Sequence, residues 1–171
     1  TSCGSGGFLL YALNKVRNKA TELYPNYAKD VRQHDRWFKY WHDFAEKNLY
    51  GIEISEQISR AAKMNMIIHD DGHTNVITSD GLVSDETIIA KTNNQGFKYG
   101  TFDFIITNPP FGSTVRQSEQ AYLKTYQLGK KEEDWLAVAT LPQNTRDGQS
   151  TEVLFIEQDY KFLKEGGYLA I

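Results

Sequence analysis

Strand-like and helical segments alternate along this chain, and this alternation constrains its fold more than any other feature. The strand-like runs, each followed by a polar residue, are residues 49–54, 75–78 and 102–107. Apolar side chains recur at helical spacing over residues 7–19, 56–66 and 152–164. The last of these helices is expected to turn Val153, Ile156, Tyr160 and Leu163 inward and to be capped by Gly166 and Gly167. Because strands that alternate with helices form parallel sheets covered by helices, the sequence predicts an α/β fold.

Two segments interrupt the alternation, and we expect both to be insertions or loops. Residues 20–47 are charged and aromatic, and their aromatic side chains are expected to pack the insertion itself. Residues 113–150 are polar, as is the connection formed by residues 84–99. Residues 1–171 are expected to be an incomplete fragment of one catalytic domain that lacks a target-recognition part. The reason is that the chain begins on a glycine-rich turn and ends inside an apolar run.

Composition and charge limit the class of protein and the choice of partner. No run approaches the roughly 18 apolar residues of a membrane span, and the single cysteine excludes an internal disulfide and a cysteine-rich zinc site. These features fit a cytoplasmic protein. The net charge of −3 argues against strong autonomous DNA binding, because non-specific affinity for DNA comes mainly from Lys and Arg. If DNA is the substrate, we expect another domain or subunit to supply most of the binding.

The first candidate site is the glycine-rich loop Cys3-Gly4-Ser5-Gly6-Gly7, which precedes a helical pattern. Glycine lacks a Cβ, so the backbone can turn tightly and approach a ligand closely. The following helix presents unpaired N–H groups and a partial positive charge, which suit a carboxylate or a phosphate. A plain turn explains the loop equally well when it is considered alone.

Two acidic residues follow predicted strands. Glu53 ends one strand, where α/β nucleotide-binding folds place an acid that accepts hydrogen bonds from ribose hydroxyls. Asp80 follows the next strand, in a position to accept from the amine of a nucleobase. Ligands of open α/β sheets bind outside the carboxyl ends of the strands, so both acids are expected to face the same crevice as the loop.

The sharpest signal is Asn108-Pro109-Pro110-Phe111, directly after the third strand-like run. An amine whose lone pair is delocalised into a ring is a poor nucleophile, and two acceptors on its N–H bonds localise that lone pair. The Asn108 side-chain oxygen and the Pro109 carbonyl are the candidate acceptors. Two prolines restrict the backbone and hold that carbonyl in place, while Phe111 offers a ring for stacking. A rigid turn without function is the alternative, and the preceding loop and acids argue against it.

These motifs resemble those of a known family. Cys3-Gly4-Ser5-Gly6-Gly7-Phe8-Leu9 and Asn108-Pro109-Pro110-Phe111-Gly112 resemble the methylase (M) subunits of type I restriction–modification systems, within the N6-adenine DNA methyltransferases. The likeness extends through residues 50–53, 62–65 and 155–171. It implies a Rossmann-like sheet, mostly parallel with helices on both faces, and S-adenosyl-L-methionine (SAM) bound in its crevice.

The resemblance also implies a role for each site residue. Cys3, Gly4, Ser5 and Gly6 line the cofactor at its methionine end, Glu53 holds the ribose, and Asp80 holds the adenine edge. Asn108 also lies at the cofactor, and Asn108, Pro109, Pro110 and Phe111 receive a target adenine that has been flipped out of DNA. Specificity and restriction subunits are the expected protein partners, with no metal and no membrane. The family motif normally begins with an acidic residue just before the equivalent of Thr1, and this chain lacks it.

Several alternatives remain open beside this interpretation. Asn-Pro-Pro-aromatic loops also occur in methylases of RNA adenine and of protein glutamine, and a non-catalytic DNA-binding or assembly module is a rival of another class. A nicotinamide dehydrogenase is disfavoured because the loop lacks the G-x-G-x-x-G spacing. We interpret His69-Asp70-Asp71-Gly72-His73 as a surface turn rather than a metal site. Cys3 is interpreted as a small buried residue rather than a nucleophile.

Overall fold

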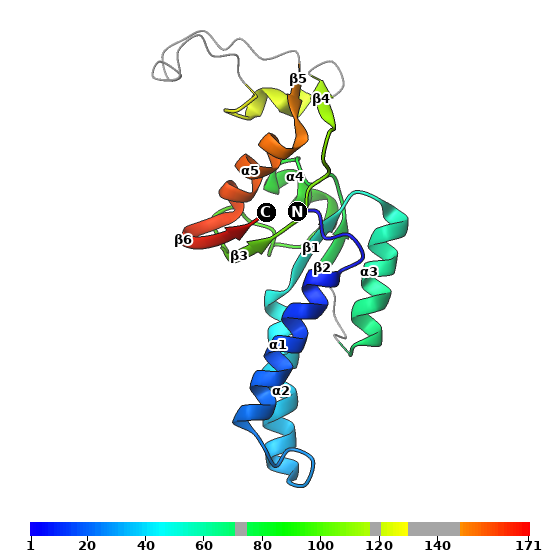
Figure 1. Ribbon diagram of the computed structural model, residues 1–171, viewed down its shortest axis with the longest axis vertical. Coiled ribbons are helices and arrows are strands. Elements are labelled where there is room, and N and C mark those ends of the chain that lie inside the picture. Colours follow the sequence, from blue (N-terminus) through cyan, green and yellow to red (C-terminus); the bar gives the residue numbers. More distant parts are fainter. Residues whose placement is uncertain (71–74, 117–120, 130–147) are drawn as a thin grey trace. The chain divides into compact units, whose positions relative to one another are not determined.

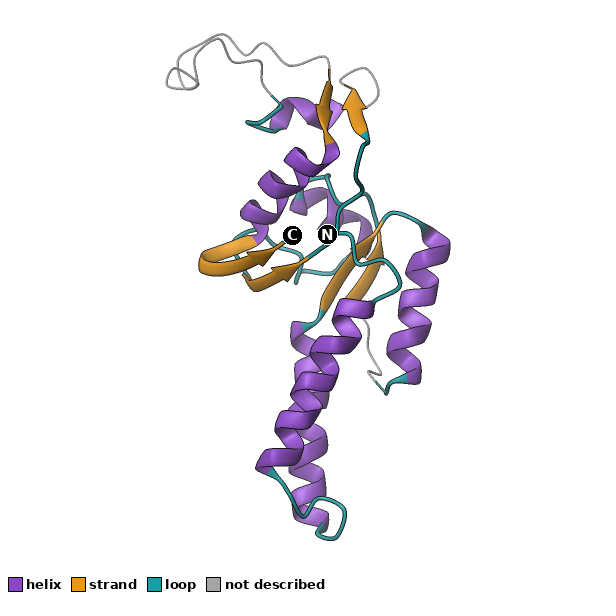
Figure 2. Cartoon of the chain, in the orientation of Figure 1, coloured by secondary structure: helices purple, strands orange, loops and turns teal. Residues whose placement is uncertain are grey.

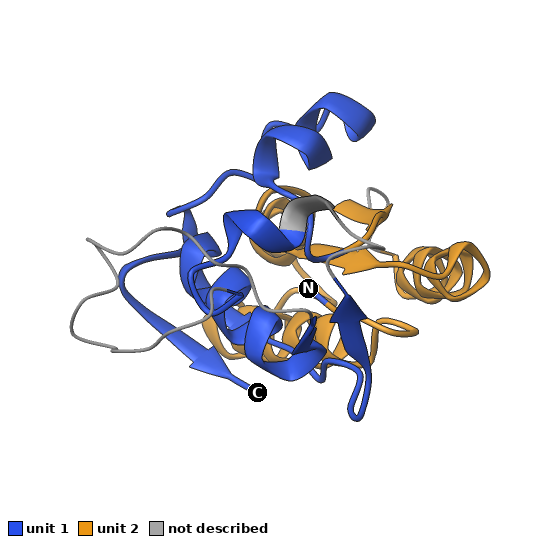
Figure 3. Ribbon diagram, turned by 90° about the horizontal axis from the view of Figure 1, so that it is seen from above, with its two compact units in different colours: residues 1, 81–171 blue, residues 2–80 orange. Residues whose placement is uncertain are grey.

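The computed structural model describes residues 1–70, 75–116, 121–129 and 148–171 and contains two compact units. The N-terminal unit comprises residues 2–80, and the C-terminal unit comprises residue 1 with residues 81–171 (Figures 1 and 3). Both units combine helices with pairs of strands (Figure 2), so the predicted α/β class is confirmed. Among the described residues, no helix is long and apolar enough to cross a membrane.

A parallel strand pair with a connecting helix forms the centre of the N-terminal unit. Strand β1 (Tyr50–Glu53) pairs with β2 (Asn75–Thr78), and Glu53 lies opposite Thr78. Helix α3 (Glu56–Ile68) connects them and begins where the Ser55 side chain accepts a hydrogen bond from the Ile58 N–H. These three elements match the strand, helix and strand that the sequence predicted.

A long helical hairpin, residues 7–48, forms the rest of the N-terminal unit (Figure 1). Helix α1 (Gly7–Leu23) packs against α2 (Val31–Asn48), and the Asp30 side chain caps α2 by accepting from two backbone N–H groups. Helix α2 therefore accounts for residues 31–47 of the segment expected to be an insertion, in which we anticipated some helix.

Some aromatic side chains of the insertion pack in the core of this unit, as expected. Trp41 is 2% exposed, contacts Trp37 edge to face, and has the Arg17 guanidinium 4.0 Å from its ring centre. Phe38 and Tyr40 remain over 40% exposed, so the expectation holds only for part of the set. The buried members of this core are Leu13, Ala20, Trp41, Ala45, Leu49, Ala62, Met66 and Val76.

The C-terminal unit contains two strand pairs. Strand β3 (Phe102–Ile106) pairs in parallel with β6 (Leu163–Ala170), and β4 (Thr114–Arg116) pairs antiparallel with β5 (Gly148–Ser150). Helix α5 (Thr151–Phe162) lies between β5 and β6 in the chain, and a short 3-10 helix, η1, covers Ala121–Thr125. Residues 117–120 and 130–147 of the expected loop lie outside the described residues.

The expected polar connection at residues 84–99 is wrong, because it contains helix α4 (Asp85–Thr92). Ser84 caps this helix by accepting from the Thr87 N–H, and the first turn carries Asp85 and Glu86. Both features favour a helix start, and the fully buried Ile88 holds the helix in the unit. The helix was missed because a single buried side chain gives no apolar periodicity.

Gly166 and Gly167 do not cap a helix as expected. Helix α5 ends at Phe162, and both glycines lie within β6, where the register with β3 shifts between Phe102 and Phe104. Gly166 has φ of +79°, a conformation that glycine adopts without steric cost, so the pair accommodates the irregularity in the strand.

The expectation that residues 102–107 form a buried strand is also wrong for most of β3. Ile105 is the buried residue of this strand, whereas Phe104 is 67% exposed and its ring stacks on Tyr168 of β6. The face of α5 that points inward likewise differs from the expected one, because Leu154, Phe155 and Phe162 are buried whereas Ile156 and Tyr160 are exposed.

A buried polar group explains the orientation of α5. The Gln158 side chain is fully buried, its amide donates to the Val83 carbonyl at 2.7 Å, and its oxygen accepts from the Tyr99 hydroxyl at 3.0 Å. The Tyr126 hydroxyl lies 2.9 Å from the same oxygen. Because a buried amide is costly unless it is hydrogen-bonded, Gln158 fixes which face of α5 turns inward.

The hairpin core gives a matched pair of substitutions on one helix. Trp41→Ala should lower the free energy of unfolding by about 3–5 kcal/mol, because it leaves a cavity beneath Arg17. Phe38→Ala, whose ring is 41% exposed, should cost about 1 kcal/mol. Urea unfolding of the two variants measures the difference, and equal losses would show that Trp41 does not organise this core.

Candidate functional site

The glycine-rich loop lies at the carboxyl end of β1. The Cys3 N–H donates to the Ile52 carbonyl at 2.9 Å, and the Gly6 N–H donates to the Cys3 carbonyl at 3.0 Å. Gly4 and Gly6 have φ of +54° and +87°, so the chain needs glycine to turn into α1 at these positions. A Cβ on Gly4 would meet no atom within 4 Å, which leaves open space above the loop.

The Glu53 carboxylate holds this loop in place. It is 8% exposed, and its two oxygens accept from the Gly4 N–H at 3.1 Å and the Ser55 N–H at 2.9 Å. One carboxylate thus connects the loop to the start of α3. A carboxylate offers about four lone-pair positions, so Glu53 keeps acceptor capacity for a ligand hydroxyl.

Ser5 and Asp80, two further residues of the predicted cofactor site, lie at the same edge of the β1–β2 pair, whereas Asn108 belongs to the other unit. Asp80 follows β2 by two residues, and the Ser79 N–H donates to the Glu53 carbonyl at 3.1 Å. The Ser5 carbonyl accepts from the Asn65 side chain at 2.9 Å, which ties the loop to α3. The N-terminal unit therefore brings Gly4, Ser5, Gly6, Glu53 and Asp80 together.

Acceptors at Glu53 and Asp80, together with the start of a helix, match a ligand of mixed polarity. Ribose hydroxyls and an amine are donors and suit the two carboxylates. A ligand carboxylate suits the N–H groups of the first turn of α1. The donor and acceptor set of this unit thus fits a nucleoside that carries an amino-acid tail.

The Asn-Pro-Pro-Phe turn belongs to the C-terminal unit and follows β3 directly. Thr107 is buried and its N–H donates to the Ala170 carbonyl at 3.0 Å, so the strand pairing continues up to the turn. Asn108 is exposed, Pro109 is buried, and Phe111 is 71% exposed. A buried proline thus anchors a turn whose amide and aromatic side chains are both accessible.

The start of α5 holds this turn through contacts that the sequence analysis missed. The Thr151 hydroxyl lies 2.9 Å from the Pro110 carbonyl, and the Thr151 N–H donates to the Ser113 carbonyl at 3.0 Å. The Gly112 N–H donates to the Glu152 carboxylate at 2.8 Å. Residues about 40 positions further along the chain therefore fix the turn on both sides of Phe111, and no local pattern could have indicated them.

Hydrogen bonding favours the ionised form of the Glu152 carboxyl. The Ser150 hydroxyl, first, and the Gly112 N–H both lower the pKa of Glu152 from its ordinary value. Gly112 has φ of +72° and follows Phe111, so this contact fixes the point where the chain leaves the turn.

Cys3 is partly rather than fully buried, so the interpretation of a small buried residue holds only in part. Its Sγ would lie 3.0 Å from a Cβ built on Gly51, so the thiol packs directly against β1. Burial raises the pKa of Cys3 to about 11, which disfavours the nucleophilic thiolate.

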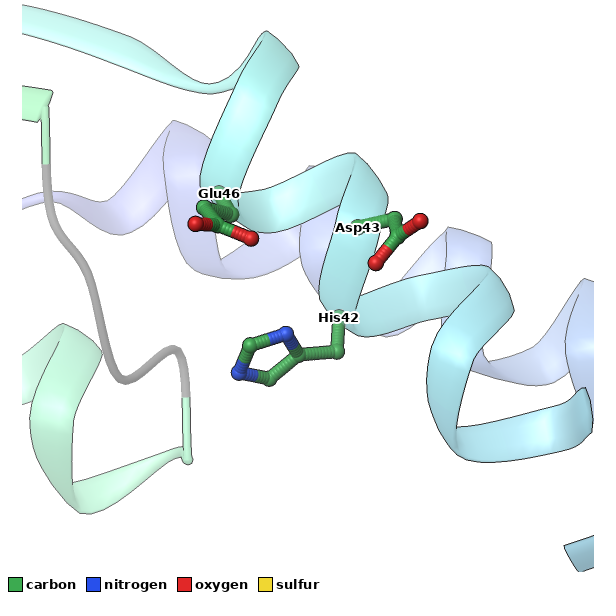
Figure 4. Close-up of side chains that lie close together, drawn as sticks. All are labelled: His42, Asp43 and Glu46. Carbon is green, nitrogen blue, oxygen red and sulfur yellow. The ribbon is translucent and has the colours of Figure 1, made fainter. Parts of the chain in front are cut away.

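A cluster on α2 offers metal-ligating atoms that the sequence analysis did not single out. The ligand atoms of His42, Asp43 and Glu46 lie within 4.8 Å of one another (Figure 4). Asp43 also pairs with Lys47 at 3.3 Å, and the His42 ring stacks on Phe38. Partly exposed donors from one helix that already have partners are common without a metal, and we assign this cluster no role. Of the predicted surface turn, residues 71–73 lie outside the described residues.

The predicted site residues thus fall into two groups on two units. The N-terminal unit holds the loop, Glu53 and Asp80, and the C-terminal unit holds residues 108–111. That both groups face one crevice stays a prediction.

The contact between Glu152 and Gly112 has a measurable consequence. Glu152→Ala removes the acceptor, so hydrogen exchange of the Gly112 amide should accelerate severalfold, with a smaller effect for Glu152→Gln, which keeps one acceptor oxygen. Glu86→Ala, which removes another exposed glutamate from this unit, is the control. Since the pKa of Glu152 is lowered, protection should persist as the pH falls through the usual range of a glutamate and be lost only below it. Unchanged exchange in Glu152→Ala would contradict the contact.

The packing of Cys3 predicts its reactivity. With a pKa of about 11, alkylation of the folded protein should be slow at pH 8 and increase about tenfold per pH unit well beyond pH 9. Mass spectrometry of the peptide that contains Cys3 follows the reaction, with urea-unfolded protein as the reference. A rate that levels off near pH 9 in the folded protein would show that the thiol is not buried.

Comparison with known proteins places this geometry in a family. The family model described as N-6 DNA Methylase matches residues 1–171. The chain is 29% identical over 154 residues to "Type II restriction enzyme and methyltransferase RM.BcgI" of Heyndrickxia coagulans, which covers 87% of this chain and 20% of the relative. It is 26% identical over 113 residues to "Type I restriction enzyme MjaIX methylase subunit" of Methanocaldococcus jannaschii, covering 66% of this chain and 14% of the relative.

The chain therefore spans a fifth or less of the length of these relatives. The family match, in contrast, extends over the whole chain and includes both groups of site residues. On this ground, the chain belongs to the N-6 DNA methylase family.

Proposed function

We propose that the protein transfers a methyl group from SAM to the N6 amine of adenine in DNA. The observation that carries this proposal is the turn after β3, where an exposed Asn108 and a Phe111 ring that is 71% exposed flank two prolines. Membership of the N-6 DNA methylase family supports DNA as the substrate.

The turn supplies the groups that the reaction requires. The adenine amine is conjugated with the ring, and acceptors at both of its N–H bonds localise the lone pair on nitrogen. The Asn108 side-chain oxygen and the Pro109 carbonyl are these acceptors, and Phe111 stacks on the base. Because a base inside a duplex cannot reach such a turn, the target adenine is flipped out. Thr151 and Glu152 hold the turn, so little ordering is left for the reaction itself.

The N-terminal unit supplies the cofactor site in this proposal. Glu53 accepts from the ribose hydroxyls, Asp80 accepts from the adenine amine, and Cys3, Gly4, Ser5 and Gly6 line the methionine end. SAM, when bound, supplies an electrophilic methyl group, so no side chain is needed to activate the donor. The Glu53 carboxylate that fixes the loop is also the ribose ligand, so loop geometry and cofactor binding depend on one residue.

The protein partners in this proposal are those of a restriction–modification system. The two relatives are named as a restriction enzyme with methyltransferase and as a methylase subunit of a type I restriction enzyme. We infer that specificity and restriction functions reside in other domains or subunits. We further infer that the protein acts in the prokaryotic cytoplasm, where such a DNA substrate is found.

Asn108→Ala in the full-length protein tests the function. It should lower kcat for methylation of adenine-containing duplex DNA by at least about a hundredfold, because one acceptor to the amine is lost. Folding should be retained since Asn108 is exposed. Asn18→Ala, an exposed asparagine on α1, is the matched control.

The choice of methyl acceptor distinguishes the proposed function from methylation of RNA or protein. Tritiated methyl transfer is measured with DNA, with RNA and with a glutamine-bearing protein. Transfer to RNA or protein but not to DNA would show that DNA is not the substrate. Unchanged DNA methylation in Asn108→Ala would contradict the role assigned to Asn108.

A further inference from the structure

The helical hairpin of the N-terminal unit carries a groove outside the predicted active site. It measures about 340 Å³ and is lined by Tyr24, Arg36, Lys39, Tyr40 and Asp43. Arg36, Lys39 and Tyr40 are exposed and Tyr24 is half-buried. The groove therefore presents two cations and two phenol groups at the surface.

The acids near this groove are already paired. Asp43 forms an ion pair with Lys47 at 3.3 Å, and Glu22 of α1 forms one with Lys19 at 2.8 Å. Arg36 and Lys39 make no ion pair with the acids of the described residues. The groove is thus locally positive although the chain as a whole carries −3.

Aromatic packing stabilises helix α2, which carries these two cations. Trp41 is buried on the opposite face of α2, Tyr27 stacks on Trp37 at 4.5 Å between ring centres, and Asp30 caps the helix. Arg36 and Lys39 are three residues apart, which is about 4.5 Å along the helix axis.

We propose that this groove binds the phosphodiester backbone of the DNA substrate, away from the target base. This inference rests on the proposed function, which identifies DNA as the substrate. Arg, Lys and Tyr side chains are common donors to phosphate oxygens, and contacts of this kind position a protein on DNA without reading its sequence. The insertion packs into the core of this unit through Trp41 and Ala45, and its exposed face thereby gains a role in holding the duplex.

The test is the salt dependence of DNA binding by the full-length protein. Arg36→Gln with Lys39→Gln should weaken binding of cognate and non-cognate duplexes alike and lower the slope of log Kd against log salt by about 2. Arg36→Lys with Lys39→Arg, which keeps both charges, should restore the wild-type slope. Lys15→Gln with Lys98→Gln removes two exposed cations outside the groove and should change neither affinity nor slope.

Each outcome decides the proposal. A wild-type slope in the Gln variants, or an equal loss in the Lys15 and Lys98 control, would overturn it, and so would Gln variants that lose binding of RNA or of an acidic protein instead of DNA. Methylation at saturating DNA should stay within about twofold of wild type. The methylation assay tests the proposed function separately. A protein that methylates no DNA would contradict that function, whereas the salt dependence of its DNA binding would still support or contradict the role of the groove.

Discussion

Carboxylates that accept backbone N–H groups hold both groups of candidate site residues in place. At the end of β1, Glu53 accepts from the Gly4 and Ser55 N–H groups, so the glycine-rich loop and the start of α3 share one anchor. A carboxylate that is 8% exposed needs such donors, because an unpaired buried charge is costly. The loop thus takes its shape from the acid that is also the candidate ribose ligand, which couples folding of this segment to its function.

The C-terminal unit also holds its candidate residues by side-chain hydrogen bonds to the backbone, which come here from helix α5. Helix α5 approaches the Asn-Pro-Pro-Phe turn with its N-terminus, where Thr151 and Glu152 bond the backbone on both sides of Phe111. Further along α5, Glu157 accepts from the Gln127 and Leu128 N–H groups, and Gln158 is fully buried among hydroxyl and carbonyl partners. A helix with many polar inward contacts therefore serves as the support of the turn, and rigidity at the turn comes from these contacts together with the two prolines.

The helical hairpin shows why net charge is a poor guide to the location of binding surfaces. The chain carries more acids than bases, yet ion pairs such as those of Asp43 and Glu22 leave Arg36 and Lys39 without acidic partners in the described hairpin. The electrostatic attraction between a phosphate and a charged side chain acts over short distances, because salt screens interactions beyond about 8–10 Å. A locally positive groove on a rigid support is compatible with an acidic chain.

The sequence by itself determined the elements with strong local signals and the candidate residues. Apolar runs predicted β1 and β2, the capping residue Ser55 predicted the start of α3, and the glycine and diproline motifs indicated the two groups of candidate site residues, since backbone restrictions and periodicity are local properties. The inward face of α5, the exposure of Phe104 and the place of Gly166 in a strand were decided by tertiary structure. So were the anchors at Thr151 and Glu152, because hydrogen bonds between residues about 40 positions apart depend on the folded path and leave no periodic trace in the sequence.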